Sequence, residues 1–179
     1  MSGLRVLVLG NGPSSWELDV AGFKNSGFLV LGCNKRAKDE VLDFVFVSDG
    51  PMLELLCQNN GYMATWVVSF NKKKHDSRVG NCPKMIWADH LEWNRSTGAA
   101  AASFAVSLRP SYIAIHGMDA EHDNRTLYRG EPPYYGKPLP AEKRALWGRG
   151  LRHVLDNSGY TYDTPSTGVY LARQEVVLS

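Results

Sequence analysis

The opening of the chain, where an apolar segment runs directly into a glycine-rich turn, constrains its fold most. Residues 5–9 read Arg-Val-Leu-Val-Leu and are followed at once by Gly10-Asn11-Gly12-Pro13-Ser14-Ser15. Because the run lacks polar alternation, it predicts a strand that is covered on both faces, as in a parallel sheet. A helix that begins after such a turn exposes backbone N–H groups that can hold a phosphate or a carboxylate. The opening therefore predicts an α/β nucleotide-binding fold.

Length and composition narrow the class of protein further. The 179 residues are 44% hydrophobic, which predicts one compact domain with a real core. A net charge of +2 argues against nucleic-acid binding, and no apolar run approaches the ~20 residues of a membrane span. The three cysteines, Cys33, Cys57 and Cys82, form no CxxC motif and predict free thiols rather than a metal site. Without a signal-peptide pattern, we expect a cytoplasmic protein.

The remaining segments alternate between strand-like and helix-like patterns. We expect strands at 29–33, 44–47, 65–69, 85–87, 112–116, 160–162 and 169–172, and helices at 51–59, 99–108 and 141–155. Shorter helical turns are expected at 16–23 and 37–42. The polar stretch 71–84, with its basic run Lys72-Lys73-Lys74-His75, predicts a solvated loop. The pattern predicts a single Rossmann-like domain, with a mostly parallel sheet and helices on both faces.

The segment from 120 to 140 is polar and rich in proline, glycine and tyrosine. A connection of this length inside a compact domain is unusual unless it serves as a lid or a binding loop. We therefore expect a short lid here. The tryptophans could serve the core or a homo-oligomer contact, and core packing is the favoured interpretation for Trp16, Trp66, Trp93 and Trp147.

Polar residues follow four of the predicted strands, at the point where each strand ends. They are Asn11 with Ser14, then Asn34, then Ser48 with Asp49, and finally Asp119. Because the carboxyl ends of parallel strands share one edge of the sheet, these side chains are expected to converge on one crevice. Each also has a structural alternative: Asn34 as a turn residue, Asp49 in a β-turn, and Asp119 as a helix cap. Together with the glycine-rich opening, they favour a binding site.

A second candidate for ligand binding is Ser96-Thr97-Gly98, which precedes an alanine-rich segment. Serine at this point predicts a helix cap, and small residues after it allow a helix to approach a sheet closely. The first turn of the helix and the Thr97 hydroxyl can also hold an anionic or nucleotide group. The two roles are compatible.

Four short segments now carry a resemblance to a known family. They are Gly10-Asn11-Gly12-Pro13-Ser14, Gly32-Cys33-Asn34, Arg95-Ser96-Thr97-Gly98 and Ile115-His116-Gly117-Met118-Asp119. In order and context, over roughly residues 4–155, they resemble the bacterial CMP-sialic-acid-dependent sialyltransferases of glycosyltransferase family 42. The related pterin-diphosphokinase-like family shares the Gly-x-Gly-Pro-Ser opening and the Gly-x-Asp segment. The resemblance implies a nucleotide-sugar donor of the CMP-sialic-acid type, transfer of the sugar to an acceptor that the sequence does not identify, and no required cofactor.

The resemblance also implies a nucleotide-binding set, consisting of Asn11, Gly12, Ser14, Asn34, Ser48, Asp49, Thr97, Gly98 and Asp119. Asn11 and Ser14 would contact the phosphate and the ribose, and Asn34 the base or the sugar. Ser48 or Asp49 would lie near the cytidine or the donor. Thr97 and Gly98 would hold the cytosine or the donor carboxylate.

For catalysis, the resemblance implies that lid tyrosines, here Tyr128 and Tyr135, stabilise the departing phosphate. Where the family carries a histidine base, this chain reads Tyr134-Tyr135-Gly136-Lys137. A lysine near its usual pKa of about 10.4 is a poor base at neutral pH, so Lys137 is expected as a cationic partner of the phosphate. His116, Glu121 and His122 stay open as alternative bases.

Two alternatives to sugar transfer remain. One is a phosphotransferase resembling the pterin diphosphokinases, which would use ATP and Mg²⁺ with Asp49 and Asp119 as metal ligands. The other is a catalytically degenerate nucleotide-binding protein of the same fold, which the missing histidine motivates.

Overall fold

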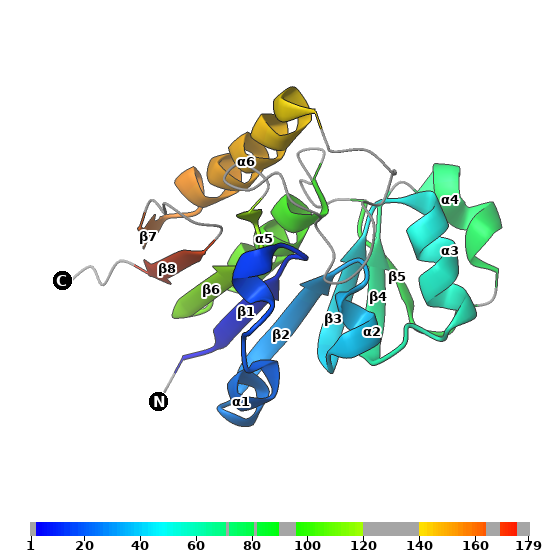
Figure 1. Ribbon diagram of the computed structural model, residues 1–179, viewed down its shortest axis with the longest axis horizontal. Coiled ribbons are helices and arrows are strands. Elements are labelled where there is room, and N and C mark those ends of the chain that lie inside the picture. The colour runs from blue at the N-terminus through cyan, green and yellow to red at the C-terminus, as the bar shows by residue number, and fades with distance from the viewer. Residues whose placement is uncertain are drawn as a thin grey trace.

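A mostly parallel sheet of eight strands organises the computed structural model, which describes residues 3–70, 72–80, 82–89, 96–119, 140–163 and 169–174 (Figure 1). The strands are β1 (Arg5–Leu9), β2 (Phe28–Cys33), β3 (Leu42–Val47), β4 (Ala64–Ser69), β5 (Met85–Trp87), β6 (Tyr112–His116), β7 (Tyr160–Tyr162) and β8 (Tyr170–Gln174). The helices are η1 (Pro13–Ser15), α1 (Val20–Asn25), α2 (Arg36–Asp39), α3 (Gly50–Gln58), α4 (Lys72–Val79), α5 (Thr97–Ser107) and α6 (Ala141–Asp156).

The strand order is β5-β4-β3-β2-β1-β6-β8-β7, with β1 to β6 parallel and β8 antiparallel to both of its neighbours. From β1 the chain builds outward in one direction to β5, and it then returns to place β6 on the other side of β1. The order therefore reverses between β1 and β6. In an open α/β sheet this reversal marks the point at which ligands bind, outside the carboxyl ends of the strands.

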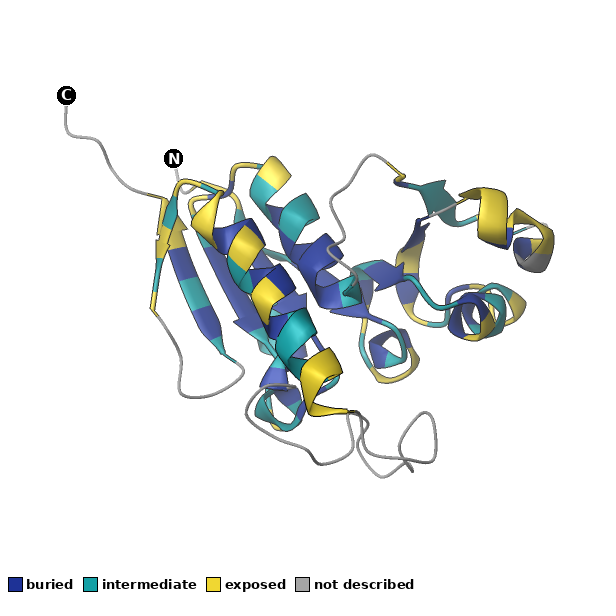
Figure 2. Ribbon diagram, turned by 90° about the horizontal axis from the view of Figure 1, so that it is seen from above, coloured by how far each residue is buried: buried dark blue, intermediate teal, exposed yellow. Residues whose placement is uncertain are grey.

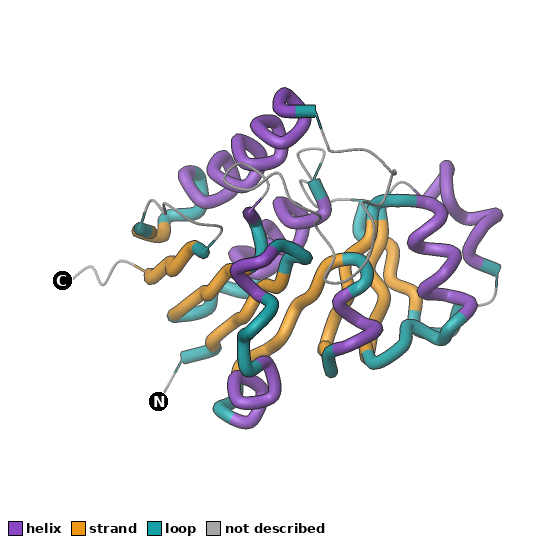
Figure 3. Tube along the Cα trace, in the orientation of Figure 1, coloured by secondary structure: helices purple, strands orange, loops and turns teal. Residues whose placement is uncertain are grey.

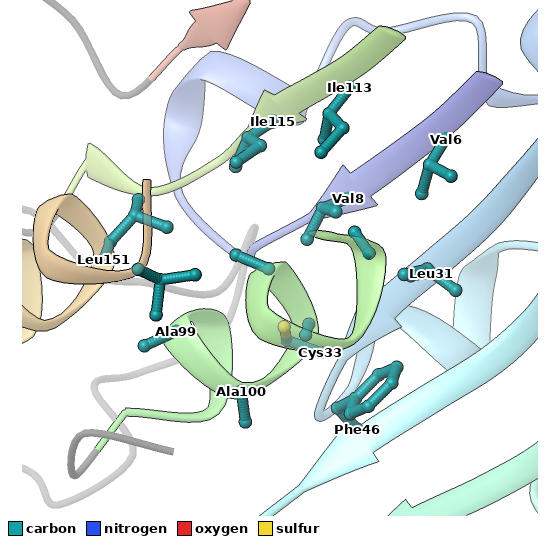
Figure 4. Close-up of a cluster of buried hydrophobic side chains, with 14 of the residues drawn as sticks. Val6, Val8, Leu31, Cys33, Phe46, Ala99, Ala100, Ile113, Ile115 and Leu151 are labelled. Atoms are coloured by element: carbon teal, nitrogen blue, oxygen red, sulfur yellow. The ribbon is translucent and has the colours of Figure 1, made fainter. Parts of the chain in front are cut away.

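Two buried clusters cover the two faces of the sheet, because alternate side chains of each strand point to opposite sides. On one face, residues such as Val6, Val8 and Ile115 pack under α5 and α6 (Figure 4). On the other face, residues such as Leu7 and Leu9 pack under the helices that follow β1, β2 and β3. Helices thus lie on both faces, and the predicted α/β class is confirmed.

The alanine-rich helix approaches the sheet closely, as its small side chains predict. Ala99, Ala100, Ala101, Ala102 and Ala105 of α5 are fully buried. The helix contacts β1, β2, β3 and β6, and it lies beside α6. Because all parallel strands end on the same side, this close contact brings the first turn of α5 to the carboxyl edge.

Two of the predicted secondary-structure elements are wrong. The polar stretch expected as a loop contains α4, whose inner side is formed by His75, 4% exposed, and Val79 (Figure 3). The helical turn expected at 37–42 is shorter, because Leu42 opens β3 and is fully buried in the sheet.

The sequence also made predictions about the cysteines, a membrane span, the tryptophans and the lid. Cys33, Cys57 and Cys82 are free thiols, and burial raises the pKa of Cys33 to about 12. Among the described helices, none is both long and apolar enough to cross a bilayer. Trp66 is 41% exposed rather than buried, whereas Trp93 and most of the predicted lid, 120–139, lie outside the described residues.

Candidate functional site

The turn after β1 and the turn after β6 meet at the point where the strand order reverses. The backbone N–H of Gly10 donates to the carbonyl of His116 at 2.7 Å, and that of Gly12 donates to the carbonyl of Gly117 at 3.0 Å. A Cβ atom at Gly10 would lie 2.7 Å from the carbonyl carbon of Gly117. Because Gly10 has no side chain, its backbone can contact that of Gly117, and this contact holds the two turns together.

The carboxylate of Asp119 lies inside the glycine-rich turn. Its Oδ2 accepts from the backbone N–H of Ser14 at 3.1 Å and from the Ser14 hydroxyl at 2.9 Å, and the same hydroxyl accepts from the N–H of Gly117 at 2.8 Å. A Cβ atom at Gly12 would lie 2.9 Å from the carboxyl carbon of Asp119, which is 6% exposed. The structure thus brings Gly12, Ser14 and Asp119 together, but as partners of one another.

Asn11 and Asn34 are placed side by side by the sheet. Leu9 of β1 pairs with Gly32 of β2, and each asparagine lies two residues beyond its member of that pair. Adjacent strands run about 4.8 Å apart, so the two residues leave the sheet as neighbours. The backbone of Asn34 has φ of 52°, a left-handed conformation that asparagine tolerates better than most residues.

The amide oxygens of both asparagines are buried and have no hydrogen-bond partner in the described part of the chain. A buried acceptor without a donor costs about 1–3 kcal/mol. Two such atoms on adjacent strands, at the edge where ligands bind, mark a place for a molecule that offers N–H or O–H donors.

The end of β3 and the start of α5 form the third part of the edge. The hydroxyls of Ser48 and Thr97 lie 2.7 Å apart and share one hydrogen bond, which leaves one of the two hydroxyl hydrogens for another acceptor. Ser96 caps α5 by accepting from the N–H of Ala99 at 3.3 Å, as predicted. A Cβ atom at Gly98 would lie 2.6 Å from the sulfur of Met118, so glycine lets the turn after β6 pack onto α5.

Asp49 has a local structural role that the sequence analysis named only as a turn. Its Oδ1 accepts from the backbone N–H of Met52 at 3.0 Å and caps α3. Among the residues that the structure describes, no group of three His, Cys, Asp or Glu side chains could hold a metal ion.

Comparisons of the chain with known protein families, with curated proteins and with solved structures find no match.

His116, which ends β6, lies next to the two joined turns. Burial lowers its pKa, against the opposing effects of a hydrogen bond to the Ser14 backbone and of the charge of Asp119. Its Nδ1 is buried without a partner in the described residues, and its ring lies against that of Phe23, with the centroids 6.4 Å apart. The lowered pKa of His116 favours the neutral imidazole.

The catalytic residues expected from the resemblance cannot be placed. Lys137, Tyr128 and Tyr135 lie outside the described residues, as do Glu121 and His122. One residue that the sequence analysis missed is Arg144 of α6, whose Nε is buried and has no hydrogen bond to any residue that the structure describes. The spacing of the sequence could have indicated it, because Arg144 lies on the same helix face as Gly148, Leu151 and Leu155 and continues their buried stripe toward the start of α6.

Proposed function

We propose that this protein binds a nucleotide sugar of the CMP-sialic-acid type at the carboxyl edge of its sheet and transfers the sugar to an acceptor. The observation that carries the proposal is that the amide oxygens of Asn11 and Asn34 are buried and have no hydrogen-bond partner within the described ranges. Ribose hydroxyls and the amino group of cytosine are donors of the kind that these two oxygens lack. The Ser48–Thr97 hydroxyl pair next to them supplies a donor for a ligand acceptor such as a carboxylate or a ring nitrogen.

The contacts of Asp119 refine the roles expected for the glycine-rich turn. Ser14 offers its N–H and its hydroxyl to Asp119, so a phosphate in this turn would have to displace a carboxylate that is already bound. The first turn of α5 is a better place for an anionic group, since the first N–H groups of a helix have no partner within it. We therefore assign Gly12, Ser14 and Asp119 to positioning, and Asn11, Asn34, Ser48 and Thr97 to ligand contact.

The contacts of Asp49 and Asp119 do not support the alternative of a Mg²⁺-dependent phosphotransferase. It would use Asp49 and Asp119 as metal ligands, yet one oxygen of Asp49 caps α3 and one oxygen of Asp119 accepts from Ser14. Nucleotide sugar binding without a required metal ion agrees better with these contacts.

A screen of melting temperature against CMP, CDP, UDP, GDP and ATP, each with and without Mg²⁺, tests the proposal. A ligand at a hundredfold its dissociation constant adds about 2.7 kcal/mol of stability, which shifts the melting temperature measurably. We expect CMP and CMP-sialic acid to stabilise the protein without Mg²⁺ and CMP-sialic acid to be consumed. Stabilisation by ATP alone, and only with Mg²⁺, would contradict the proposal. Binding of CMP-sialic acid without turnover would indicate the degenerate binding protein.

A further inference from the structure

The guanidinium of Arg144 is a half-buried cation for which the described residues provide no counter-charge. Its Nε is buried, and no hydrogen bond or ion pair reaches the side chain from the part of the chain that the structure describes. The adjacent Lys143 differs, because it is exposed and its ammonium lies 5.6 Å from the centre of the Trp147 ring. Burying a charged group without a partner costs free energy, so an arginine that has no partner among the described residues requires an explanation.

Helix geometry places Arg144 on the inner side of α6. Gly148, Leu151 and Leu155 are buried and lie four, seven and eleven residues further along, which is the spacing of one helix face. Leu151 and Leu155 belong to the same buried cluster as Ala99 of α5 (Figure 4). Arg149, on the same helix, is exposed. Arg144 therefore extends the face that packs on α5, and Arg149 does not.

The same face leads to the candidate site. Helices α5 and α6 lie side by side with their first turns at the same end, which is the end toward which β1 and β6 run (Figures 1 and 2). Side chains of a helix point back toward its N-terminus, so the Arg144 side chain extends toward the edge that carries Thr97 and Ser48. The helix dipole disfavours a cation in the first turn, so local electrostatics do not explain the arginine.

We propose that Arg144 binds the phosphate of the nucleotide. A guanidinium presents paired N–H donors that fit two phosphate oxygens, and it keeps its charge at every relevant pH. This assignment rests on the proposed function and deepens it. It supplies a phosphate partner that the glycine-rich turn does not offer, because Asp119 already accepts from Ser14 there.

Calorimetric titration of CMP and of cytidine into the wild type, R144Q, R144K and R149Q tests the assignment. A hydrogen-bonded charge contact predicts that R144Q weakens CMP binding about ten- to a hundredfold and leaves cytidine binding within about twofold. We expect R144K to lose part of the CMP affinity, because it keeps the charge but not the paired donors. R149Q, the matched exposed control, should bind both compounds as the wild type does.

Failure of the assignment and failure of the proposed function give different results. Two results would show that Arg144 does not hold the phosphate while the proposed function stands. One is that CMP binds and has the same affinity for R144Q as for R149Q. The other is that R144Q weakens the binding of CMP and of cytidine equally. If CMP does not bind to the wild type, the proposed function fails, and the same variants are titrated with ATP, GDP and inorganic phosphate. Binding that R144Q alone weakens would then support an anion site at Arg144, and binding that R144Q leaves unchanged, or no binding, would overturn it.

A measurement of folding separates a ligand-binding role from a structural one. Removing an unpaired, half-buried charge should leave the melting temperature of R144Q without ligand equal to or above that of the wild type. A marked drop, absent from R149Q, would show that the guanidinium supports the fold, and it would overturn the assignment.

Discussion

At the junction of the β1 and β6 turns, Ser14, Gly117 and Asp119 bond to one another, whereas buried polar atoms around the junction, on the two asparagines and on α6, have no hydrogen-bond partner among the described residues. Ser14, Gly117 and Asp119 form a closed set of hydrogen bonds between the two turns. The amide oxygen of Asn34 and the Nε of Arg144 are buried without any hydrogen bond within the described residues. The junction of the two turns is thus satisfied by hydrogen bonds within the chain, whereas the Oδ1 atoms of Asn11 and Asn34 beside it have no partner among the described residues.

The difference separates polar groups that stabilise the fold from polar groups that contact the ligand under the proposed function. The glycine-rich opening has the composition of a phosphate-binding turn, yet its donors are taken by a carboxylate of the same chain. The unsatisfied atoms beside it are acceptors on asparagines and a cation on α6. A complementary molecule would carry both N–H or O–H donors and a negative charge, which describes a nucleotide.

The largest expected effect comes from adding a side chain where the two turns touch. In G10A the new Cβ would meet the carbonyl carbon of Gly117 at 2.7 Å, and backbone atoms cannot move aside as a flexible side chain can. We expect a loss of about 3 kcal/mol or more in the free energy of unfolding, measured with urea. Gly159 provides a control, because its φ is 73° but no atom lies within 4 Å of a built Cβ. G159A should cost about 1–2 kcal/mol, and an equal effect at both positions would show that the junction is not tight.

A smaller loss is expected when the carboxylate is removed from the turn. D119A removes a buried carboxylate and leaves the partly buried N–H of Ser14 without its acceptor, which predicts a loss of about 2 kcal/mol. The control is D19A, which removes the carboxylate that accepts from Gly22 at the exposed start of α1 and should cost about 1 kcal/mol. If inorganic phosphate stabilises D119A but not the wild type, Asp119 blocks an anion site. A loss no greater than that of D19A would remove Asp119 from the junction.

Most of the sheet could be predicted because its strands are short, apolar and bounded by turn residues. The bounds predicted for β1, β5, β6 and β7 agree with the structure. Helix α4 could not be predicted in this way, because its sequence is nearly all polar and its buried side rests on His75 and Val79. Such a helix is stabilised by its place beside α3, with which it shares contacts, and not by a local pattern.

The sequence was enough to predict where the candidate site lies, but not which of its residues bond to one another. The rule that strands end at one edge brings Asn11, Asn34 and Asp119 to the same region. Sequence spacing does not reveal that Ser14 bonds to Asp119, 105 residues away, because that contact depends on β6 lying next to β1. Before the fold was known, no feature of the chain distinguished a carboxylate that binds a ligand from one that binds a turn.

The buried amide oxygen of Asn34, which has no partner among the described residues, can be removed without a change in the backbone. N34G keeps the backbone conformation, since glycine adopts a φ of 52° without strain, and it removes the buried amide. We expect about three- to tenfold weaker binding of CMP by calorimetry, corresponding to one lost hydrogen bond of about 1 kcal/mol. The matched control is N60G, because Asn60 has a φ of 51° and is exposed. Equal CMP affinity in the two variants would place Asn34 outside the ligand contact.

The smallest expected effect is a change in how stability depends on pH, and it tests the junction from the β6 side. Burial lowers the pKa of His116 in the folded protein, so as the pH falls below about 6.5 the unfolded chain takes up the proton first. The contribution of His116 to stability is therefore complete above that pH and declines as the pH falls. In H116Q, which keeps a hydrogen-bond donor but does not titrate, the free energy of unfolding should fall less between pH 7.5 and pH 5. Urea unfolding of both proteins at several pH values in that range measures the difference. A wild type that gained stability relative to H116Q on acidification would mean that the protonated imidazole finds a partner in the fold, and it would contradict the expected effect of burial.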